Sequence, residues 1–234
     1  MEIQAAVAKI SKFGSRISGD TLEIVERPNG GVSIVLADGR SSGHDAKAIS
    51  SLVVRKVIGL LADGVRDGAA ARAASDYLFT VYEGKASVYL SILSADLQTN
   101  TLVITRNNQT PVFIANLDHI ECVSGESQAI GTERNIKPSI LEIPLQADST
   151  IVMYTDGLGH AGETVGESLD ICTTLLGLLD EQAPTAQHIA DTTLNHAIRL
   201  DQGRPNDDMS IVVLRVVSTT TDHVRRMIVR FPVD

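Results

Sequence analysis

The sequence predicts an α+β fold in which antiparallel β-strands form the interior and helices pack outside them. Two observations indicate this fold. Apolar, β-branched segments follow one another in long runs, and amphipathic helical segments occur in two pairs, one early and one late in the chain of 234 residues. Sequential strands favour antiparallel pairing, and grouped helices are typical of layers outside a sheet sandwich. No internal repeat, low-complexity tract or linker interrupts this order, so we expect residues 1–234 to form a single domain.

The expected strands are recognised by apolar alternation or by β-branched runs that end in turn residues. Thr21–Arg27 alternates, and Gly31–Asp38 is apolar and ends at an Asp-Gly turn. Turn-rich sequences separate the strands that follow. The remaining expected strands are Ala86–Ala95, Thr101–Thr105, Val112–Ala115, Glu142–Leu145, Ser149–Thr155 and Met209–Val217, with Val224–Phe231 as a candidate last strand.

Helices are predicted where apolar residues recur at steps of three and four, which places them on one helix face. This pattern predicts an early pair over Asp45–Leu61 and Ala69–Tyr82, and a late pair over Ser168–Leu179 and Thr185–Leu200. Thr185 follows a proline and is the expected N-cap of the last helix, because its hydroxyl can accept a hydrogen bond from a free backbone N–H.

Composition and charge argue against several classes of function. The net charge of −9 and the aromatic content of 3% disfavour binding to nucleic acid or to an anionic membrane. No apolar run is long enough to span a bilayer, and the first residues lack the pattern of a secretory signal, so we expect a cytoplasmic protein. The two cysteines and six histidines are scattered, without the spacing of a zinc or iron site.

Acidic residues recur at the ends of the expected strands. Asp20 precedes one strand, Asp38 and Asp156 each close an apolar strand immediately before a glycine, and the pair Asp207-Asp208 precedes the strand at Met209. Carboxylates gathered at one rim of a sheet repel each other unless a cation neutralises them, and hard divalent ions prefer oxygen ligands of this kind. The alternative is that Asp-Gly simply makes turns, as we expect for 63–64 and 67–68 between the first two helices.

The ordered series SGD, LADGRSSG, MYTDGLG and NDDMSIVVL, together with the element order, resembles the metal-dependent type 2C (PPM) protein serine/threonine phosphatases. Within them it is most similar to the bacterial SpoIIE branch, which includes stand-alone stressosome phosphatases of the RsbX type. The resemblance spans about residues 15–217. It implies a four-layer αββα sandwich, two antiparallel sheets flanked by helix pairs, and two divalent ions, Mn²⁺ or Mg²⁺.

The same resemblance implies a role for each acidic motif. Asp38 would bridge both ions, and the backbone carbonyl of Gly39 would join the second ion. Asp156 and Asp207 would hold the first ion, with Asp20 at the second, directly or through water. Asp208 would then orient its neighbour or the following turn, although the reverse assignment of Asp207 and Asp208 stays open. Asp38 and Asp156 are the expected catalytic pair.

Other residues near the motifs carry weaker expectations. Many family members have a histidine after Asp-Gly that protonates the leaving oxygen, but here the residue is Arg40, so a metal-bound water is the simplest acid. His44 and His160 are alternatives, although surface positions suit both better. Arg40 and Arg16 are candidates for holding the phosphate, because a guanidinium matches phosphoryl oxygens bidentately, against the alternative of ordinary surface arginines. Residues 160–183 are expected to form either a flap that shapes substrate choice or a surface helix pair.

The resemblance also limits the partner. It implies hydrolysis of phosphoserine or phosphothreonine on a protein, and a lone catalytic domain points to a STAS-domain antagonist or stressosome protein as substrate, such as an RsbS- or RsbR-like protein. The main alternative is a catalytically silent binding module that has kept the fold. A small-molecule phosphatase would use the same metal chemistry.

Overall fold

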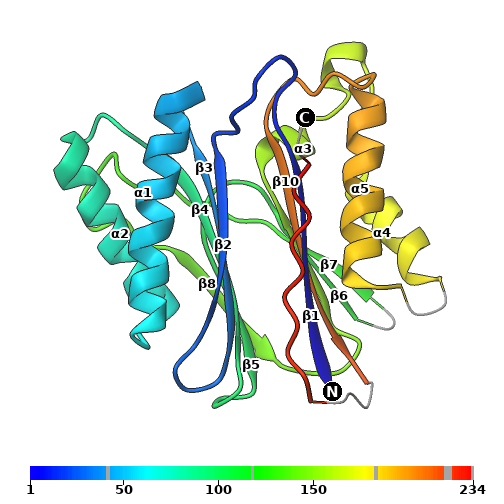
Figure 1. The fold of residues 1–234 in the computed structure, drawn as a ribbon, viewed down its shortest axis with the longest axis horizontal. Coiled ribbons are helices and arrows are strands. Elements are labelled where there is room, and N and C mark those ends of the chain that lie inside the picture. The colour runs from blue at the N-terminus through cyan, green and yellow to red at the C-terminus, as the bar shows by residue number, and fades with distance from the viewer. Residues whose placement is uncertain (41–42, 117–118, 182–183, 219–222, 233–234) are drawn as a thin grey trace.

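The computed structural model describes residues 1–40, 43–116, 119–181, 184–218 and 223–232. Two β-sheets face each other at the centre of the molecule, and a pair of helices covers the outer face of each sheet (Figure 1). The elements are, in chain order, β1 (Glu2–Ile10), β2 (Asp20–Glu26), β3 (Gly31–Gly39), α1 (Gly43–Ala62), α2 (Asp67–Tyr82), β4 (Val88–Asp96), β5 (Thr101–Asn107), β6 (Val112–Asn116), β7 (His119–Val123), β8 (Ser139–Pro144), β9 (Thr150–Tyr154), α3 (Asp156–Gly159), the 3₁₀ turn Glu163–Val165, α4 (Ile171–Leu179), α5 (Ala186–Leu200) and β10 (Met209–Val217).

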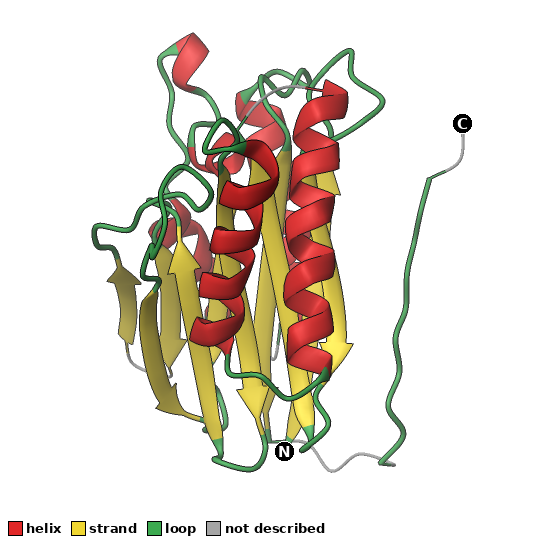
Figure 2. Cartoon of the chain, turned by 90° about the vertical axis from the view of Figure 1, so that its left-hand side faces the viewer, coloured by secondary structure: helices red, strands yellow, loops and turns green. Residues whose placement is uncertain are grey.

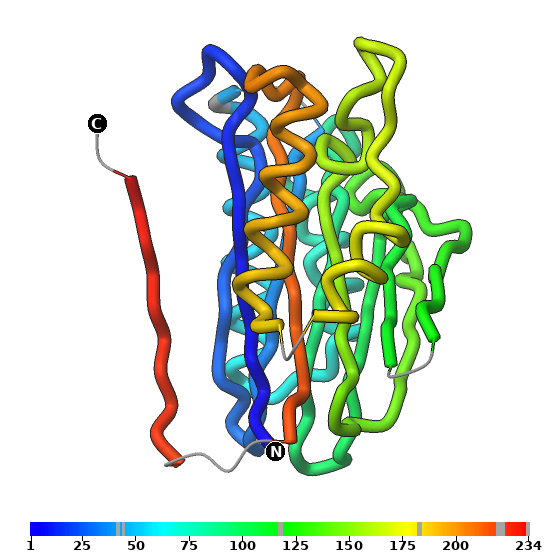
Figure 3. Tube along the Cα trace, turned by 90° about the vertical axis from the view of Figure 1, so that its right-hand side faces the viewer, coloured from blue at the N-terminus to red at the C-terminus, as the bar shows by residue number. Residues whose placement is uncertain are grey.

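Both sheets are antiparallel and have five strands, in the orders β1-β10-β9-β6-β7 and β2-β3-β4-β5-β8. Helices α1 and α2 cover the second sheet (Figure 2), whereas α4 and α5 cover the first (Figure 3). The predicted α+β fold and its four-layer αββα arrangement are therefore confirmed. Within the described ranges, no helix is both long and apolar enough to cross a membrane.

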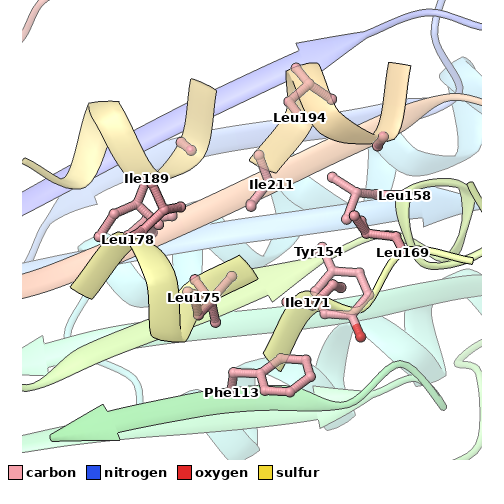
Figure 4. Packing of buried hydrophobic residues seen from close by; sticks show 14 of the residues in the cluster. Phe113, Tyr154, Leu158, Leu169, Ile171, Leu175, Leu178, Ile189, Leu194 and Ile211 are labelled. Carbon is pink, nitrogen blue, oxygen red and sulfur yellow. The ribbon is translucent and has the colours of Figure 1, made fainter. Parts of the chain in front are cut away.

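Three buried apolar clusters fill the three interfaces between these layers. The cluster between the sheets contains Ile34, Ile104 and Val212, which are almost fully buried. A second cluster lies under α1 and α2, and a third lies under α4 and α5, where Leu175 and Ile189 meet the sheet (Figure 4). Helices α1, α2, α4 and α5 thus each bury an apolar face, which is the main source of their stability. In α2, however, Tyr77 and Val81 belong to the apolar face expected from the sequence, yet both are exposed.

Helix caps explain where the late helices begin. The Thr185 hydroxyl accepts a hydrogen bond from the His188 N–H at 3.1 Å, so the predicted N-cap is confirmed. Helix α4 starts at Ile171 instead of Ser168, because the Asp170 carboxylate caps it by accepting from the Thr173 N–H at 3.0 Å. Both helices lie against the sheet. The described part of residues 160–183 contains the 3₁₀ turn and one α-helix, α4, which packs on the sheet through Leu175. Only one helix of the expected pair therefore lies in this range, and a role of the range in substrate choice stays a prediction.

Two strands were missing from the sequence prediction, and one predicted strand is wrong. The strand β1 pairs with β10 along its whole length, although its sequence lacks clear alternation, and β7 is a short edge strand. In contrast, residues 223–232 form no strand: they run as an extended segment beside the sandwich (Figures 2 and 3), and Ile228, Val229 and Phe231 are 82–86% exposed. This segment has strand-like composition, but its described residues join neither sheet.

Candidate metal centre

The acidic residues predicted from the sequence lie at one end of the sandwich, the upper end in Figure 1. Asp20 is the first residue of β2 and Asp38 is near the end of β3, and the two are direct register partners. Asp156 follows β9 and begins α3, while Asp207 and Asp208 immediately precede β10, the neighbour of β9. Strand ends from both sheets therefore bring these carboxylates to a common rim.

Asp38 lies at the centre of the acidic group. Burial, the nearby Asp20 and Asp156 carboxylates and a hydrogen bond with Asp156 raise its pKa to about 9, with a further contribution from Asp207. A carboxyl group with this pKa carries a proton at neutral pH, because a second or third negative charge in a partly buried site is unfavourable. A bound cation would offset the repulsion among the carboxylates that contributes to this shift.

Asp20 is the most deeply buried of these residues, at 1% exposure. Its Oδ2 accepts hydrogen bonds from Thr155 Oγ1 at 3.0 Å and from Ser210 Oγ at 2.5 Å, whereas its buried Oδ1 has no hydrogen-bond partner among the described residues. Burial raises the pKa of Asp20 to about 7, although the hydrogen bond from Ser210 and the charge of Lys9 act in the opposite direction. A buried carboxylate oxygen without a partner is costly unless it meets a cation or a donor.

Two lysines support the backbone of Asp20. Lys9 Nζ on β1 and Lys47 Nζ on α1 each donate to the Asp20 carbonyl oxygen at 3.0 Å. Lys47 also donates to Thr21 Oγ1 at 2.7 Å. These contacts join β1 and α1 to the first residues of β2, and they place positive charge beside the acidic group. Sequence inspection missed both lysines because the contacts depend on tertiary structure.

The two adjacent acids before β10 have different surroundings. Both carboxylate oxygens of Asp208 accept backbone hydrogen bonds, from the Lys12 N–H at 2.9 Å and the Gly19 N–H at 2.7 Å. Asp207 is exposed, and its Oδ1 accepts only from the N–H of Asp208 at 2.9 Å. Asp208 therefore holds the loop between β1 and β2, whereas Asp207 keeps a carboxylate oxygen free.

Gly39 and Gly157 are needed for close approach of the backbone. A Cβ atom at residue 39 would lie 2.4 Å from the carbonyl oxygen of Ala46 in α1, and one at residue 157 would lie 2.3 Å from the carbonyl oxygen of Asp208. Backbone atoms cannot move aside as a flexible side chain would. The two glycines after Asp38 and Asp156 thus set the distances from β3 to α1 and from α3 to the start of β10.

The two arginines predicted to hold phosphate are in different positions. Arg40 is exposed and its Cζ lies 4.6 Å from the centre of the Tyr89 ring, while Tyr89 lines a small cavity together with Asp38 and Asp156. Arg16 is exposed in the loop before β2, and it forms no hydrogen bond or ion pair with any described residue. Of the two histidines, His160 has an exposed side chain, and the side chain of His44 lies outside the described residues.

The same cavity contains polar residues that the sequence did not single out. Asn108 is 5% exposed, its Nδ2 donates to Ser91 Oγ at 2.5 Å, and its Oδ1 has no partner. The cavity, of about 10 Å³, is large enough for roughly one water molecule. In the sequence, the only local sign of these cavity residues is the pair of asparagines at positions 107 and 108, where β5 ends.

The donor set suits a hard divalent cation, although it is not preassembled around one. Carboxylate oxygens dominate the rim. Asp20 Oδ1 has no hydrogen-bond partner among the described residues, and the raised pKa of Asp38 likewise fits a site for positive charge. Among the described residues, no three His, Cys, Asp or Glu side chains are already arranged as a metal-binding group.

The family model of stage II sporulation protein E (SpoIIE) matches residues 28–217, which is most of the chain. The chain belongs to the SpoIIE family. Two curated relatives are stage II sporulation protein E from Priestia megaterium, 23% identical over 218 residues, and from Bacillus subtilis (strain 168), 25% identical over 221 residues. Each alignment covers 93% of this chain but only 37% and 26% of those relatives, respectively.

Solved structures of phosphatases share the SpoIIE-family fold found here. The PP2C phosphatase domain of Bacillus subtilis SpoIIE, solved with a fragment of its regulatory domain, has a TM-score of 0.78 at 22% identity, covering 94% of this chain and 64% of that one. RsbX in complex with magnesium gives 0.70 at 16% identity, with coverage of 91% and 94%. The catalytic domain of the phosphatase PstP with two manganese ions gives 0.70 at 17%, with coverage of 92% and 99%. At these identities the likeness establishes the fold.

Proposed function

We propose that this domain hydrolyses phosphoserine or phosphothreonine on a protein, using a water activated by two divalent metal ions. The observation that carries the proposal is the convergence of carboxylates on Asp38, where burial and the neighbouring Asp20 and Asp156 raise its pKa to about 9. Membership of the SpoIIE family and the fold shared with PP2C phosphatase domains support the same activity. The structures of RsbX with magnesium and of PstP with manganese support Mg²⁺ or Mn²⁺ as the ions.

The proposed ligands follow from the positions of the donors. Asp38, at the centre of the group, would contact both ions, with the Gly39 carbonyl and Asp20 Oδ1 at one and Asp156 and Asp207 at the other. The partnerless Oδ1 of Asp20 and the single hydrogen bond of Asp207 support this assignment. Asp208 is proposed as a structural residue, since both of its oxygens are already used.

Two divalent ions at this site would supply the charge that activates the attacking water and offsets the charge on the phosphoryl oxygens. The chain's own residues then have three tasks. Thr155 and Ser210 fix the orientation of Asp20. Asp38, whose pKa burial and the neighbouring carboxylates raise to about 9, would have to lose its proton to bind the ions. Arg40, stacked on Tyr89 beside the cavity, is proposed to bind the phosphoryl oxygens, whereas the exposed Arg16 has weaker support.

The substrate is proposed to be a phosphorylated STAS-domain antagonist or stressosome protein. Similarity to RsbX supports this partner class, and the net charge of −9 favours a protein over nucleic acid. Phosphorylated candidate proteins encoded beside this gene are the direct test. Release of phosphate from one of them, but not from a scrambled phosphopeptide, is the expected result.

The activity itself is tested with p-nitrophenyl phosphate in Mn²⁺, with Asp38→Asn as the matched variant. We expect hydrolysis that EDTA abolishes and that Asp38→Asn lowers at least a hundredfold. Activity that survives either treatment would falsify the two-metal mechanism. Metal binding by calorimetry without hydrolysis of any phosphoester would instead favour the catalytically silent binding module.

A further inference from the structure

A polar groove of about 720 Å³ lies at the same end of the sandwich as the acidic residues. The loop between β7 and β8 forms two of its walls, through residues 125–128 and 133–137, and the turn between β5 and β6 forms the third. A volume of this size is within the range of ligand sites in proteins, about 300 to 1,000 Å³. Neither the acidic motifs nor the family comparison assigns a role to this groove.

The groove walls are held in place although they lack regular secondary structure. Ser127 Oγ donates to the Arg106 carbonyl at 2.8 Å, and Asn107 Nδ2 donates to the Gln128 carbonyl at 3.1 Å. On the other arm of the loop, the Asn135 N–H donates to Asp76 Oδ1 of α2 at 3.1 Å, and Arg134 stacks on Phe79 at 4.8 Å. The groove is therefore fixed against β5 and α2 before any ligand arrives.

The groove and the candidate metal centre share the turn between β5 and β6. Asn108 and Thr110 line the small cavity beside Asp38 and Asp156, whereas Gln109, between them in sequence, lines the groove. Successive residues of the turn between β5 and β6 thus alternate between the small cavity beside the acidic residues and the groove. A chain with its phosphorylated residue at Asp38 would pass over this turn and enter the groove within a few residues, since an extended chain advances roughly 3.3 Å per residue.

The chemistry of the lining fits a peptide segment. Side-chain amides of Gln109, Gln128 and Asn135 offer donors and acceptors for a peptide backbone. The charges are balanced, with Glu126 and Glu133 against Arg134 and Lys137, in a protein whose net charge is −9. An acidic or polar peptide therefore meets less electrostatic repulsion in this groove than over the rest of the negatively charged surface. Ile136 is the single large apolar side chain of the lining and is itself buried, so the groove does not suit an apolar helix.

We propose that this groove, lined by residues 109, 125–128 and 133–137, binds the extended peptide that flanks the phosphorylated residue of the protein substrate. The inference rests on the proposed phosphatase function and specifies how that site would select a protein substrate over a small phosphoester. It assigns Gln109, Arg134 and Lys137 as specificity residues, which contact the substrate away from the reacting phosphoryl group.

The test compares two substrates and uses a charge-matched control. Lys137→Glu and Gln109→Ala are measured against Arg55→Glu, an exposed position on α1 remote from the groove lining. Each variant is assayed in Mn²⁺ with a 12-residue acidic phosphopeptide and with p-nitrophenyl phosphate, and each kcat/KM is divided by that of the unmodified protein. For Lys137→Glu we expect the loss of kcat/KM to be at least fivefold larger on the phosphopeptide than on p-nitrophenyl phosphate. The additional loss should appear as a higher KM. Gln109→Ala should show the same split, and Arg55→Glu should show none. Equal losses on both substrates, or no loss, would overturn the proposal.

A binding measurement separates this inference from the activity. Fluorescence anisotropy of the labelled phosphopeptide reports occupancy of the groove even in a protein that turns nothing over. If the unmodified protein binds the peptide and Lys137→Glu weakens binding at least fivefold, the groove assignment stands even without hydrolysis, and only the proposed activity fails. If hydrolysis of p-nitrophenyl phosphate is normal but peptide binding is unchanged by both groove variants, the groove assignment fails and the activity stands.

Discussion

Asp20 and Asp38 stand directly opposite each other in the ladder between β2 and β3. Side chains at directly opposed positions of antiparallel strands have Cβ atoms roughly 4.5–5.5 Å apart, a spacing at which two like charges destabilise a sheet. The protein keeps this pair at a buried end of the ladder, where the pKa of Asp20 rises to about 7 and that of Asp38 to about 9. The acidic pair therefore binds protons when it has no cation.

The first prediction concerns the pH dependence of stability without metal. Both pKa values lie above the ordinary value of 3.8, so the folded protein holds protons that the unfolded chain has released. The free energy of unfolding in EDTA should therefore fall as pH rises from about 5 to 9, by at most about 1.4 kcal/mol per pH unit for each proton. Urea unfolding at pH 6, 7 and 8 measures this slope.

Asp38→Asn provides the control for this prediction, because it removes the group with the highest pKa while keeping its shape. Between pH 6 and 8, its free energy of unfolding should fall less steeply with pH, by the amount that corresponds to nearly one bound proton. In EDTA at pH 8, the variant should be more stable than the unmodified protein. Saturating Mn²⁺ should stabilise the unmodified protein increasingly as pH rises, since ligation releases the protons. Identical slopes for the two proteins in EDTA would contradict the central position of Asp38.

The second prediction separates Asp207 from Asp208. Asp208→Ala removes the acceptor of two backbone hydrogen bonds that hold the loop before β2, so it should cost about 2–4 kcal/mol in the free energy of unfolding. Asp207→Ala should cost less than about 1 kcal/mol, because this side chain is exposed. Its affinity for Mn²⁺, however, should fall at least tenfold. Urea unfolding in EDTA and calorimetric titration with Mn²⁺ measure the two effects, and a reversed pattern would exchange the two roles.

The sequence predicted the parts of the fold and site that depend on local pattern. Apolar strands closed by Asp-Gly identify Asp38 and Asp156 because strand, turn and carboxylate are consecutive. The order of strands and helices predicts the layers for the same reason. The strand β1 was missed because all of its pairing partners lie in β10, at the other end of the chain. The segment at 224–231 was wrongly predicted because strand-like composition cannot reveal that no partner strand is available.

Contacts between residues far apart in the sequence could not be predicted. Thr155 and Ser210 contact Asp20 across 135 and 190 positions, so no local pattern indicates them. The glycines after Asp38 and Asp156 allow close approach to Ala46 and Asp208, which no local pattern indicates. Asp67 was expected to make a turn, yet it forms a buried ion pair.

The third prediction concerns this ion pair, which lies at the far end of β2 from the acidic site. Arg27 and Asp67 are 2.5 Å apart and almost completely buried, and Arg27 also donates to Ser33 and Ser94. Asp67→Ala leaves a buried guanidinium without its carboxylate and should cost about 3–5 kcal/mol. The double variant Arg27→Met/Asp67→Ala should recover part of this loss. Urea unfolding measures both, and a double variant less stable than Asp67→Ala alone would contradict the explanation by an unpaired charge.

The fourth prediction tests whether glycine sets the geometry of the acidic site. Gly39→Ala places a methyl group against the Ala46 carbonyl, and Gly157→Ala places one against the Asp208 carbonyl, so backbone must shift in both cases. Each should cost about 1–3 kcal/mol. Each should also weaken Mn²⁺ binding at least tenfold, because the displaced segments carry Asp38, Asp156 and Asp207. Calorimetric titration and urea unfolding measure the two effects.

Gly59→Ala is the matched control for these two variants. Gly59 is an exposed residue of α1, and a Cβ atom there would meet nothing within 4 Å. Alanine stabilises a helix interior relative to glycine by about 0.5–1 kcal/mol, so this variant should raise the free energy of unfolding. Its Mn²⁺ affinity should match that of the unmodified protein. Suppose that Gly39→Ala and Gly157→Ala instead matched Gly59→Ala in Mn²⁺ affinity and in the free energy of unfolding. In that case the distances from the Asp-Gly turns to α1 and β10 would not control metal binding, and the two glycines would serve only as turn residues.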